Sequence, residues 1–170
     1  MAWTAFPTWV VGQVSLASDW NTYVANNMQF LATPPFCKVY RQSATTGSAA
    51  NPSPYDTVVA DTVSGYSVST FKYTVAIAGT YQVLTSWNQN GAADGAYLNV
   101  SVAHNVSSAG SNQGTQNGAA GNVQTQCLDT VNGCVVGDTL YSFYSGSASL
   151  AASVGGPPYL CYMTILKVSN

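Results

Sequence analysis

The sequence is poor in charged residues. Of its 170 residues, four are Lys or Arg and six are Asp, none is Glu, and His104 is the single histidine. Soluble domains usually carry about a quarter charged residues, so solubility here depends on neutral hydroxyl and amide side chains. General acids, general bases and metal ligands are correspondingly scarce. The composition predicts a structural or binding protein rather than an enzyme, with no metal site and no cofactor.

Other function classes are disfavoured by the same scarcity. A formal net charge of −2 provides no basic surface for a phosphate backbone, so no nucleic acid partner is expected. No apolar run approaches the roughly 20 residues of a membrane-spanning helix, and no basic region precedes a hydrophobic stretch near the N-terminus, which argues against a secretory signal. A catalytic triad would need His104 as its base, and no G-x-S-x-G motif is present. We therefore interpret His104 as a histidine at a strand end or in a loop.

The first 35 residues differ from the rest of the chain. A short apolar arm precedes a segment, from about Ser18 to Leu31, whose apolar residues recur at spacings of three and four. This period predicts one amphipathic helix, which Ser15 or Ser18 is placed to cap and Pro34-Pro35 to end. A lone helix of this length is marginal in water. We expect it to pack on its own body, on copies of itself or on a partner.

Aromatic residues concentrate in this N-terminal segment, which contains three of the four tryptophans. Exposed Trp and Tyr side chains are typical of protein interfaces. We predict an anchoring segment over residues 1–35; the alternative is that these side chains fold back over the chain's own β domain. The predicted attachment interface consists of Trp3, Phe6, Trp9, Trp20, Tyr23, Val24, Met28 and Leu31.

From residue 36 to residue 170 the pattern is that of a β domain. Short apolar and alternating runs are separated by turn signals that include Asn90-Gly91 and Asn132-Gly133. In the run 70–77, alternate residues from Phe71 through Tyr73 to Ile77 are predicted to lie on one face. The polar tract 107–122 predicts a long surface loop. A mainly β fold, an antiparallel sandwich or jelly roll, is therefore expected. The predicted strands are 36–42, 57–62, 70–77, 80–87, 96–103, 123–127, 139–144 and 159–168.

Four cysteines allow two interpretations. Cys127 and Cys134 flank a segment that contains Asn132-Gly133, so they could face each other across a hairpin and form a disulfide. Alternatively, all four, including Cys37 and Cys161, are buried free thiols. No C-x-x-C pair that would indicate a zinc site is present.

Three segments resemble the jelly roll of C1q and tumour necrosis factor domains. The stretch 78–83 resembles their G-x-Y-x-hydrophobic strand, and 135–140 resembles the later strand entry that contains Gly-Asp. The run 159–168 resembles their closing strand. The resemblance covers roughly residues 36–170 and implies a C1q/TNF-like fold and a homotrimer.

Each of these motifs has a physical reason. Gly79 permits a sharp corner that a side chain would obstruct. Tyr81 is expected to pack its ring beneath that corner with its hydroxyl in solvent, and Asp138 to bond the backbone of its turn. By the same resemblance Asp94 could join a calcium site, although it also fits an ordinary hairpin loop.

A second resemblance covers residues 10–31. This segment resembles one on bacteriophage virion proteins in which a G-x-hydrophobic-T-A-A-D-hydrophobic-N phrase leads into a helix ending R-D-N-L-x-x-L. Leu16 replaces the usual Thr here, and Ala25-Asn26 replaces the Arg-Asp pair.

This resemblance implies a structural virion protein. We expect a trimeric capsid decoration or head-fibre protein, made in the host cytoplasm, that binds the major capsid protein or another virion protein at the virion surface. The alternative is a tail-tip or tail-fibre subunit that binds a host-surface receptor or glycan. A secreted lectin-like module is a third interpretation.

Overall fold

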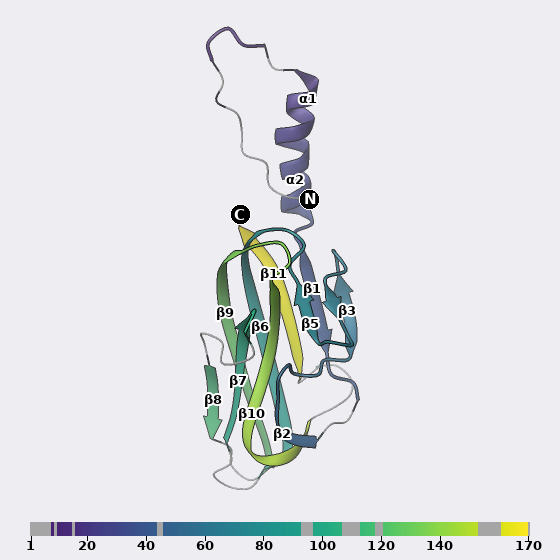
Figure 1. Ribbon diagram of the computed structural model, residues 1–170, viewed down its shortest axis with the longest axis vertical. Helices are drawn as coiled ribbons and strands as arrows, with labels where there is room; N and C mark the ends of the chain where they lie inside the picture. The colour runs from purple at the N-terminus through teal and green to yellow at the C-terminus, as the bar shows by residue number, and fades with distance from the viewer. Residues whose placement is uncertain are drawn as a thin grey trace.

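The protein consists of an antiparallel β body and a helix that projects from one end of it (Figure 1). The computed structural model describes residues 8, 10–14, 16–43, 46–92, 97–106, 113–117, 121–152 and 161–169. Within these ranges, no helix has the length and apolarity needed to cross a bilayer. The mainly β fold expected from the sequence is confirmed.

The helical segment is continuous from residue 17 to residue 32. It comprises α1 (Ala17–Asp19), the π-helical turn η1 (Trp20–Ala25) and α2 (Asn26–Ala32). The predicted helix is confirmed, but its cap is not a serine. Leu16 is the N-cap residue, and its N–H donates to the Asp19 carboxylate at 2.9 Å; Ser18 lies within the first turn and Ser15 outside the described residues.

The helix ends where the prolines predict. The N–H and the hydroxyl of Thr33 both donate to the Gln29 carbonyl oxygen at 2.9 Å, which satisfies one of the last free carbonyl groups. Pro34-Pro35 then leads directly into the first strand.

Eleven strands are described in the body. They are β1 (Phe36–Tyr40), β2 (Thr46–Ala50), β3 (Thr57–Asp61), β4 (Tyr66–Ser67), β5 (Lys72–Thr74), β6 (Gly79–Ala92), β7 (Tyr97–His104), β8 (Gln113–Asn117), β9 (Gly121–Cys134), β10 (Thr139–Ala152) and β11 (Tyr162–Ser169).

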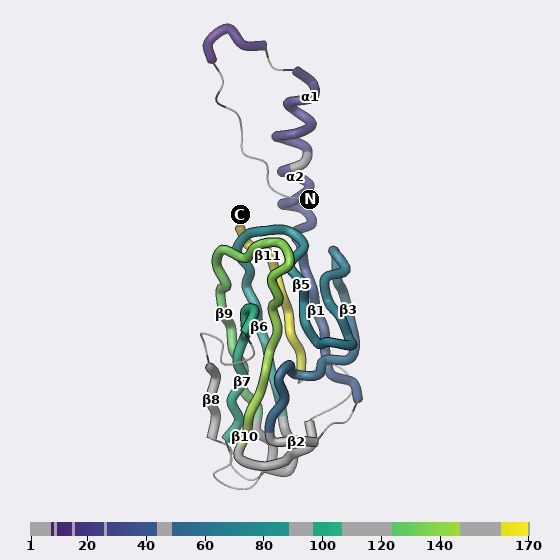
Figure 2. The backbone as a smooth tube through the Cα atoms, viewed as in Figure 1, coloured from purple at the N-terminus to yellow at the C-terminus, as the bar shows by residue number. Residues whose placement is uncertain are grey.

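The strands form two layers. One layer has the order β3-β1-β11-β6-β9; in the other, β10 pairs with β7 on one side and with β5 and β2 on the other, and β8 extends the layer beyond β7. All these pairings are antiparallel. The layers meet where the end of β10 pairs with β6, at Ala151 with Asn90 and Ala152 with Gln89. Figure 2 traces the backbone through both layers.

Aromatic side chains fill the space between the layers. The rings of Trp87 on β6 and Tyr144 on β10 stack with centroids 4.2 Å apart, and Tyr55 meets Trp87 edge-on at 5.5 Å. The alternation predicted around β5 is also present, because Tyr73 and Val75 are fully buried. The core is thus built from the inward positions of facing strands.

Two expectations about turns are wrong. Asn90-Gly91 lies within β6, and Asn132-Gly133 lies within β9, because these two strands pair along their whole length from Gly79 opposite Cys134 to Ala92 opposite Gly121. Near Asn132-Gly133 the register shifts and Gly133 has a φ of 67°, so the Asn-Gly pair forms a bulge instead of a hairpin. Pairing along a neighbouring strand outweighs the local turn signal.

The expected long loop at 107–122 is also partly wrong. The stretch Gln113–Asn117 forms β8 against β7, and β9 already begins at Gly121. These residues are small and polar, so no apolar alternation marks them as strands.

The predicted hairpin between Cys127 and Cys134 does not exist. Both residues lie on β9, opposite Thr85 and Gly79 of β6. They are seven positions apart on one strand, which places their Cα atoms about 23 Å apart. A bridge between them therefore has no geometric basis, and all four cysteines are buried free thiols.

Candidate functional site

The helix exposes most of its apolar face. Trp20, Met28 and Leu31 are 60%, 65% and 68% exposed, whereas Tyr23 and Val24 are half-buried. The helix rises away from the body and does not lie along it (Figure 1). Trp3, Phe6 and Trp9 of the predicted interface lie outside the described residues. In the single chain, the predicted contact side chains of the helix are therefore not covered by the β body.

The last helical turn is anchored to the strands. Phe30 is buried, and the Lys167 ammonium of β11 lies 4.5 Å from the centroid of its ring. The Lys167 N–H donates to the Pro35 carbonyl oxygen at 2.9 Å. These contacts join the end of α2 to β11 and fix the start of the projecting segment.

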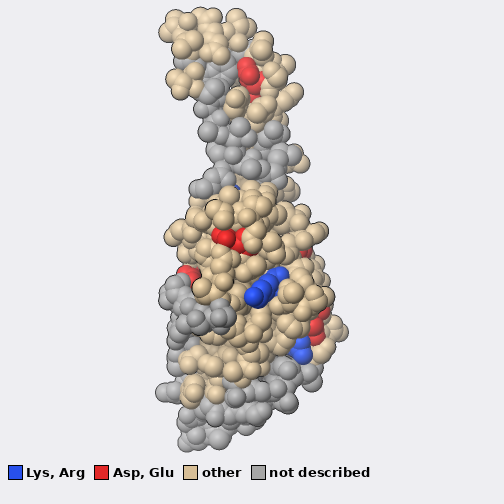
Figure 3. All heavy atoms as spheres, in the orientation of Figure 1, with Lys and Arg blue, Asp and Glu red and all other residues tan. Residues whose placement is uncertain are grey.

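Two of the few charged side chains of the body, Arg41 and Asp56, stabilise loops. In Figure 3 the charged side chains are isolated spots on a largely uncharged face. Arg41 donates to the carbonyl oxygens of Ser43 at 2.7 Å and Pro54 at 2.6 Å and lies 3.6 Å from the Asp56 carboxylate. Burial alone would raise the pKa of Asp56, but hydrogen bonds from Ser43 and Gln42 and the Arg41 charge together lower it.

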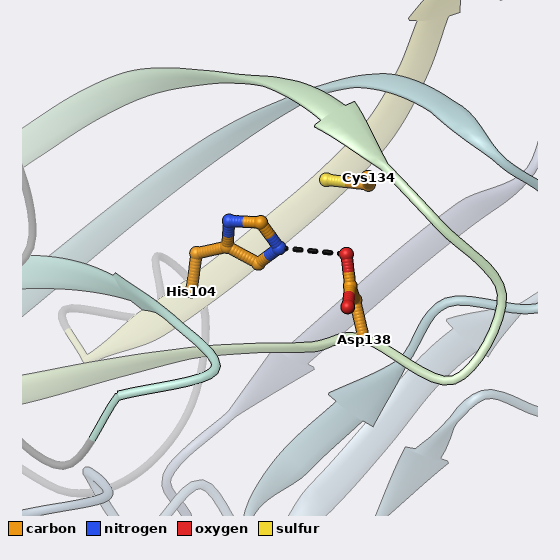
Figure 4. A group of neighbouring side chains, drawn as sticks. All are labelled: His104, Cys134 and Asp138. Atoms are coloured by element: carbon orange, nitrogen blue, oxygen red, sulfur yellow. Dashed lines mark hydrogen bonds and ion pairs between the residues drawn. The ribbon is translucent and has the colours of Figure 1, made fainter.

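A second polar cluster lies at the turn between β9 and β10. His104, the last residue of β7, lies with Nε2 2.8 Å from Asp138 Oδ2 (Figure 4). The Val135 N–H donates to the same oxygen at 2.8 Å, and Asn105 Nδ2 donates to Asp138 Oδ1 at 2.6 Å. The Val135, Asn105 and His104 contacts, in that order, lower the pKa of Asp138 to about 2. The predicted backbone bonding by Asp138 is confirmed.

Sequence reasoning did not bring these residues together. His104 does end a strand, as interpreted, but its partner Asp138 lies 34 positions away. The register of β7 and β10 pairs Leu140 with His104 and so places His104 beside Asp138. No sequence period reports such a pairing, so the Gly137-Asp138 turn motif was the only available signal.

The corner at Gly79 is as predicted, and Tyr81 differs in one respect. Gly79 has a φ of 146°, and a Cβ there would collide with the Ser169 carbonyl oxygen and lie 2.6 Å from Lys167 Cε. The Tyr81 ring is fully buried, as predicted. Its hydroxyl, which was expected in solvent, is also buried and donates to the Ile77 carbonyl oxygen at 2.6 Å. Burial raises the pKa of Tyr81 to about 12. Asp94 lies outside the described residues.

The strand arrangement defines a C1q/TNF-like jelly roll, and solved structures agree. The globular domain of zebrafish complement 1qA matches with a TM-score of 0.57 and 14% identity, over 80% of this chain and 99% of that chain. Murine APRIL at pH 5.0 matches with a TM-score of 0.57 and 11% identity, over 79% and 98%, and murine APRIL at pH 8.5 with 0.56 and 12%, over the same shares. At these identities the likeness shows the fold alone. No protein-family model and no curated protein sequence matches the chain.

Proposed function

We propose that this chain is a structural protein of a bacteriophage virion, which forms a homotrimer through its jelly roll and is attached through its N-terminal helix. The observation that carries the proposal is the projecting helix, whose Trp20, Met28 and Leu31 side chains are largely exposed. The resemblance of residues 10–31 to a segment of virion proteins is the reason for proposing a bacteriophage virion as the particle.

The helix needs a partner for physical reasons. Its 16 residues span about 24 Å, and an isolated helix of this length is marginal in water. Each large apolar side chain that becomes buried contributes roughly 1.5–3 kcal/mol. Trp20 and Met28 are residue types that pack well into protein pockets. Docking on another protein would therefore stabilise both the helix and the complex.

Self-association is supported by the composition and the sheet edges. Neutral surfaces can pack together without burying an unpaired charge. The strand β3 ends one layer and carries exposed Val58 and Val59. An apolar edge strand invites pairing with another chain unless it is covered. The C1q/TNF-like fold, whose relatives form trimers by the resemblance noted above, makes a threefold assembly the leading arrangement.

The leading version is a capsid decoration or head-fibre protein bound to the major capsid protein. In this version the jelly roll faces outward and the helix lies against the particle. A tail-tip or tail-fibre subunit that binds a host-surface receptor or glycan is the version to be tested against it.

The test uses the full chain and particles that lack it. Wild-type protein is expected to sediment alone as a trimer and to co-sediment with the particles. Changing Met28 and Leu31 to Gln should abolish co-sedimentation and leave the trimer intact. The control changes two exposed apolar residues of the body, Leu128 and Val136, to Gln and should bind as wild type does.

Each readout addresses one part of the proposal. A monomeric wild-type protein would contradict the homotrimer, and co-sedimentation of the helix variant would contradict anchoring by the helix. Binding at the tail with only a few copies per particle, together with blocking of infection, would replace capsid decoration by receptor recognition.

A further inference from the structure

Three chemically different side chains converge at the end of the body from which the helix projects. His104 ends β7, Cys134 ends β9, and Asp138 follows in the turn to β10. One ligand atom of each residue lies within 4.8 Å of the other two. In Figure 4 the Cys134 sulfur is directed toward the His104–Asp138 pair. An imidazole, a thiol and a carboxylate therefore face a common point.

We propose that His104 Nε2, Cys134 Sγ and Asp138 Oδ2 bind one Zn²⁺ ion, with water as the fourth ligand. Imidazole nitrogen, thiolate sulfur and carboxylate oxygen are the ligands that Zn²⁺ takes in proteins. The thiolate disfavours Ca²⁺ and Mg²⁺, which select oxygen ligands. His104 is one-third exposed at its side chain, so the site is open to solvent on one side.

The distances require only small side-chain movements. Zn–N, Zn–O and Zn–S bonds of about 2.0–2.3 Å in a tetrahedron place neighbouring ligand atoms about 3.3–3.8 Å apart. The His104 and Asp138 atoms, now 2.8 Å apart, would separate slightly. The sulfur, within 4.8 Å of both, would move inward by about 1 Å.

The carboxylate is already held in place by second partners. Asn105 Nδ2 donates to the other oxygen of Asp138 at 2.6 Å, and the Val135 N–H donates to Oδ2 at 2.8 Å. Asn105 is itself fixed, because its Oδ1 accepts from the Thr139 N–H at 2.6 Å. Hydrogen bonds of this kind orient metal ligands and raise metal affinity.

Proton and charge balance are simple. Burial, with the nearby Asp138 charge, raises the pKa of the Cys134 thiol to about 11, so the metal-free residue is protonated near neutral pH. Zn²⁺ displaces this proton into solvent. In the metal-bound state His104 Nε2 donates its lone pair to Zn²⁺ and carries no proton, and the neutral imidazole holds its proton on Nδ1. The thiolate and the carboxylate then neutralise the two charges of the ion.

The consequence is a cross-link between three segments. The ion would tie the end of β7 to the end of β9 and to the start of β10, which the present structure joins through the His104–Asp138 contact. The proposal departs from the absence of a metal site predicted from composition, and it is independent of the virion assignment. The competing explanation of this cluster is that the His104–Asp138 contact only stabilises the turn and binds no metal.

The test titrates the full chain, freed of metal with a chelator, with Co²⁺ as a spectroscopic probe. One equivalent per chain should give a thiolate-to-cobalt charge-transfer band and tetrahedral d–d bands, and one equivalent of Zn²⁺ should abolish them. Zn²⁺ should also raise the melting temperature, and the rise should grow with the free Zn²⁺ concentration. Absence of the charge-transfer band in the wild-type protein would overturn the proposal.

Two ligand variants and one control test the ligand set. Cys134→Ser should abolish the charge-transfer band, whereas the control Cys127→Ser, a buried thiol of the same strand, should retain it. His104→Gln at its partly exposed position should weaken Co²⁺ binding at least tenfold and serves if the Cys134 variant fails to fold. An unchanged band in Cys134→Ser, or an unchanged Co²⁺ affinity in His104→Gln, would refute this ligand set.

Discussion

The ammonium group of Lys167 lies 4.5 Å from the centre of the Phe30 ring, so a cation on the last strand contacts the last turn of the helix. Lys167 is 2% exposed, and its Nζ donates to the Ser169 carbonyl oxygen at 2.9 Å. Burial lowers the pKa of this ammonium group. The junction thus combines apolar packing, which stabilises it, with a buried charge, which costs free energy.

Substitution of Lys167 separates these two contributions. Lys167→Met keeps an unbranched stem against Phe30 and removes the charge, so its free energy of unfolding is expected within about 1 kcal/mol of wild type or above it. Lys167→Ala removes the packing as well and should cost about 2–3 kcal/mol. Urea denaturation measures both. Equal losses in the two variants would show that the cation–ring contact itself dominates.

The corner at Gly79 should tolerate no side chain. An added Cβ would collide with the Ser169 carbonyl oxygen, at a φ of 146° that L-residues avoid. Gly79→Ala is expected to cost about 2–5 kcal/mol. Gly133→Ala is the matched control, because its φ of 67° is also positive but no atom lies within 4 Å of the added Cβ, and it should cost about 1–2 kcal/mol. Thermal denaturation compares them; equal losses would contradict the steric argument.

Local sequence signals located most of the fold. Alternation around Tyr73, the helical period before Pro34 and the Gly79 motif each predict what the structure contains, because each depends on neighbours in the sequence. The full length of β9 could not be predicted, since its Asn132-Gly133 pair signals a turn and only pairing with β6 makes it a bulge. At this Asn-Gly pair, tertiary pairing overrides the local turn propensity.

The candidate site was less predictable than the fold. Trp20 and Leu31 are exposed on a helix that projects from the β body, and the sequence left that point open. The cluster at His104 depends on strand register, because β7 and β10 must pair with Leu140 opposite His104. No spacing in the sequence contains that information.

A buried hydroxyl network couples Tyr55 to the opposite strands. Its hydroxyl lies 2.7 Å from Thr85 Oγ1, and Thr85 Oγ1 lies 2.8 Å from Ser142 Oγ. Tyr55→Phe leaves Thr85 short of a partner and should cost about 1–3 kcal/mol. In a double-mutant cycle with Thr85→Val, the two losses should be non-additive by at least about 0.5 kcal/mol. Strict additivity in urea denaturation would show that the two groups act independently.

The carboxylate of Asp56 should make stability depend on pH in the acid range. Its two oxygens accept the N–H groups of Gln42 at 2.7 Å and Ser43 at 2.9 Å. Because its folded pKa lies below the ordinary 3.8, its contribution is present above that pH and is lost as the pH falls through the folded value. The stability difference between wild type and Asp56→Asn should therefore shrink from pH 6 toward pH 2. A constant difference in urea denaturation would contradict this assignment.

The cysteines should be inert in the folded protein and all reactive once it unfolds. Burial raises the pKa of Cys37 to about 12 and that of Cys134 to about 11. At pH 8 the thiolate fraction is then on the order of 10⁻³ or less, and the thiolate is the form that reacts. Labelling of the native protein with a thiol reagent should accordingly be slow and limited by opening of the fold.

Labelling in denaturant without a reductant decides between the two cysteine arrangements. Four free thiols should then react at once, and Cys127→Ser should lower the number by one. A bridge between Cys127 and Cys134 would leave two reactive thiols in the wild-type protein. It would also require β9 to fold back on itself, which its continuous pairing with β6 opposes. Rapid labelling of one thiol in the native protein would instead show that one strand end opens readily. Loss of this rapid labelling in Cys134→Ser would place the opening at the end of β9, beside the turn at Asp138.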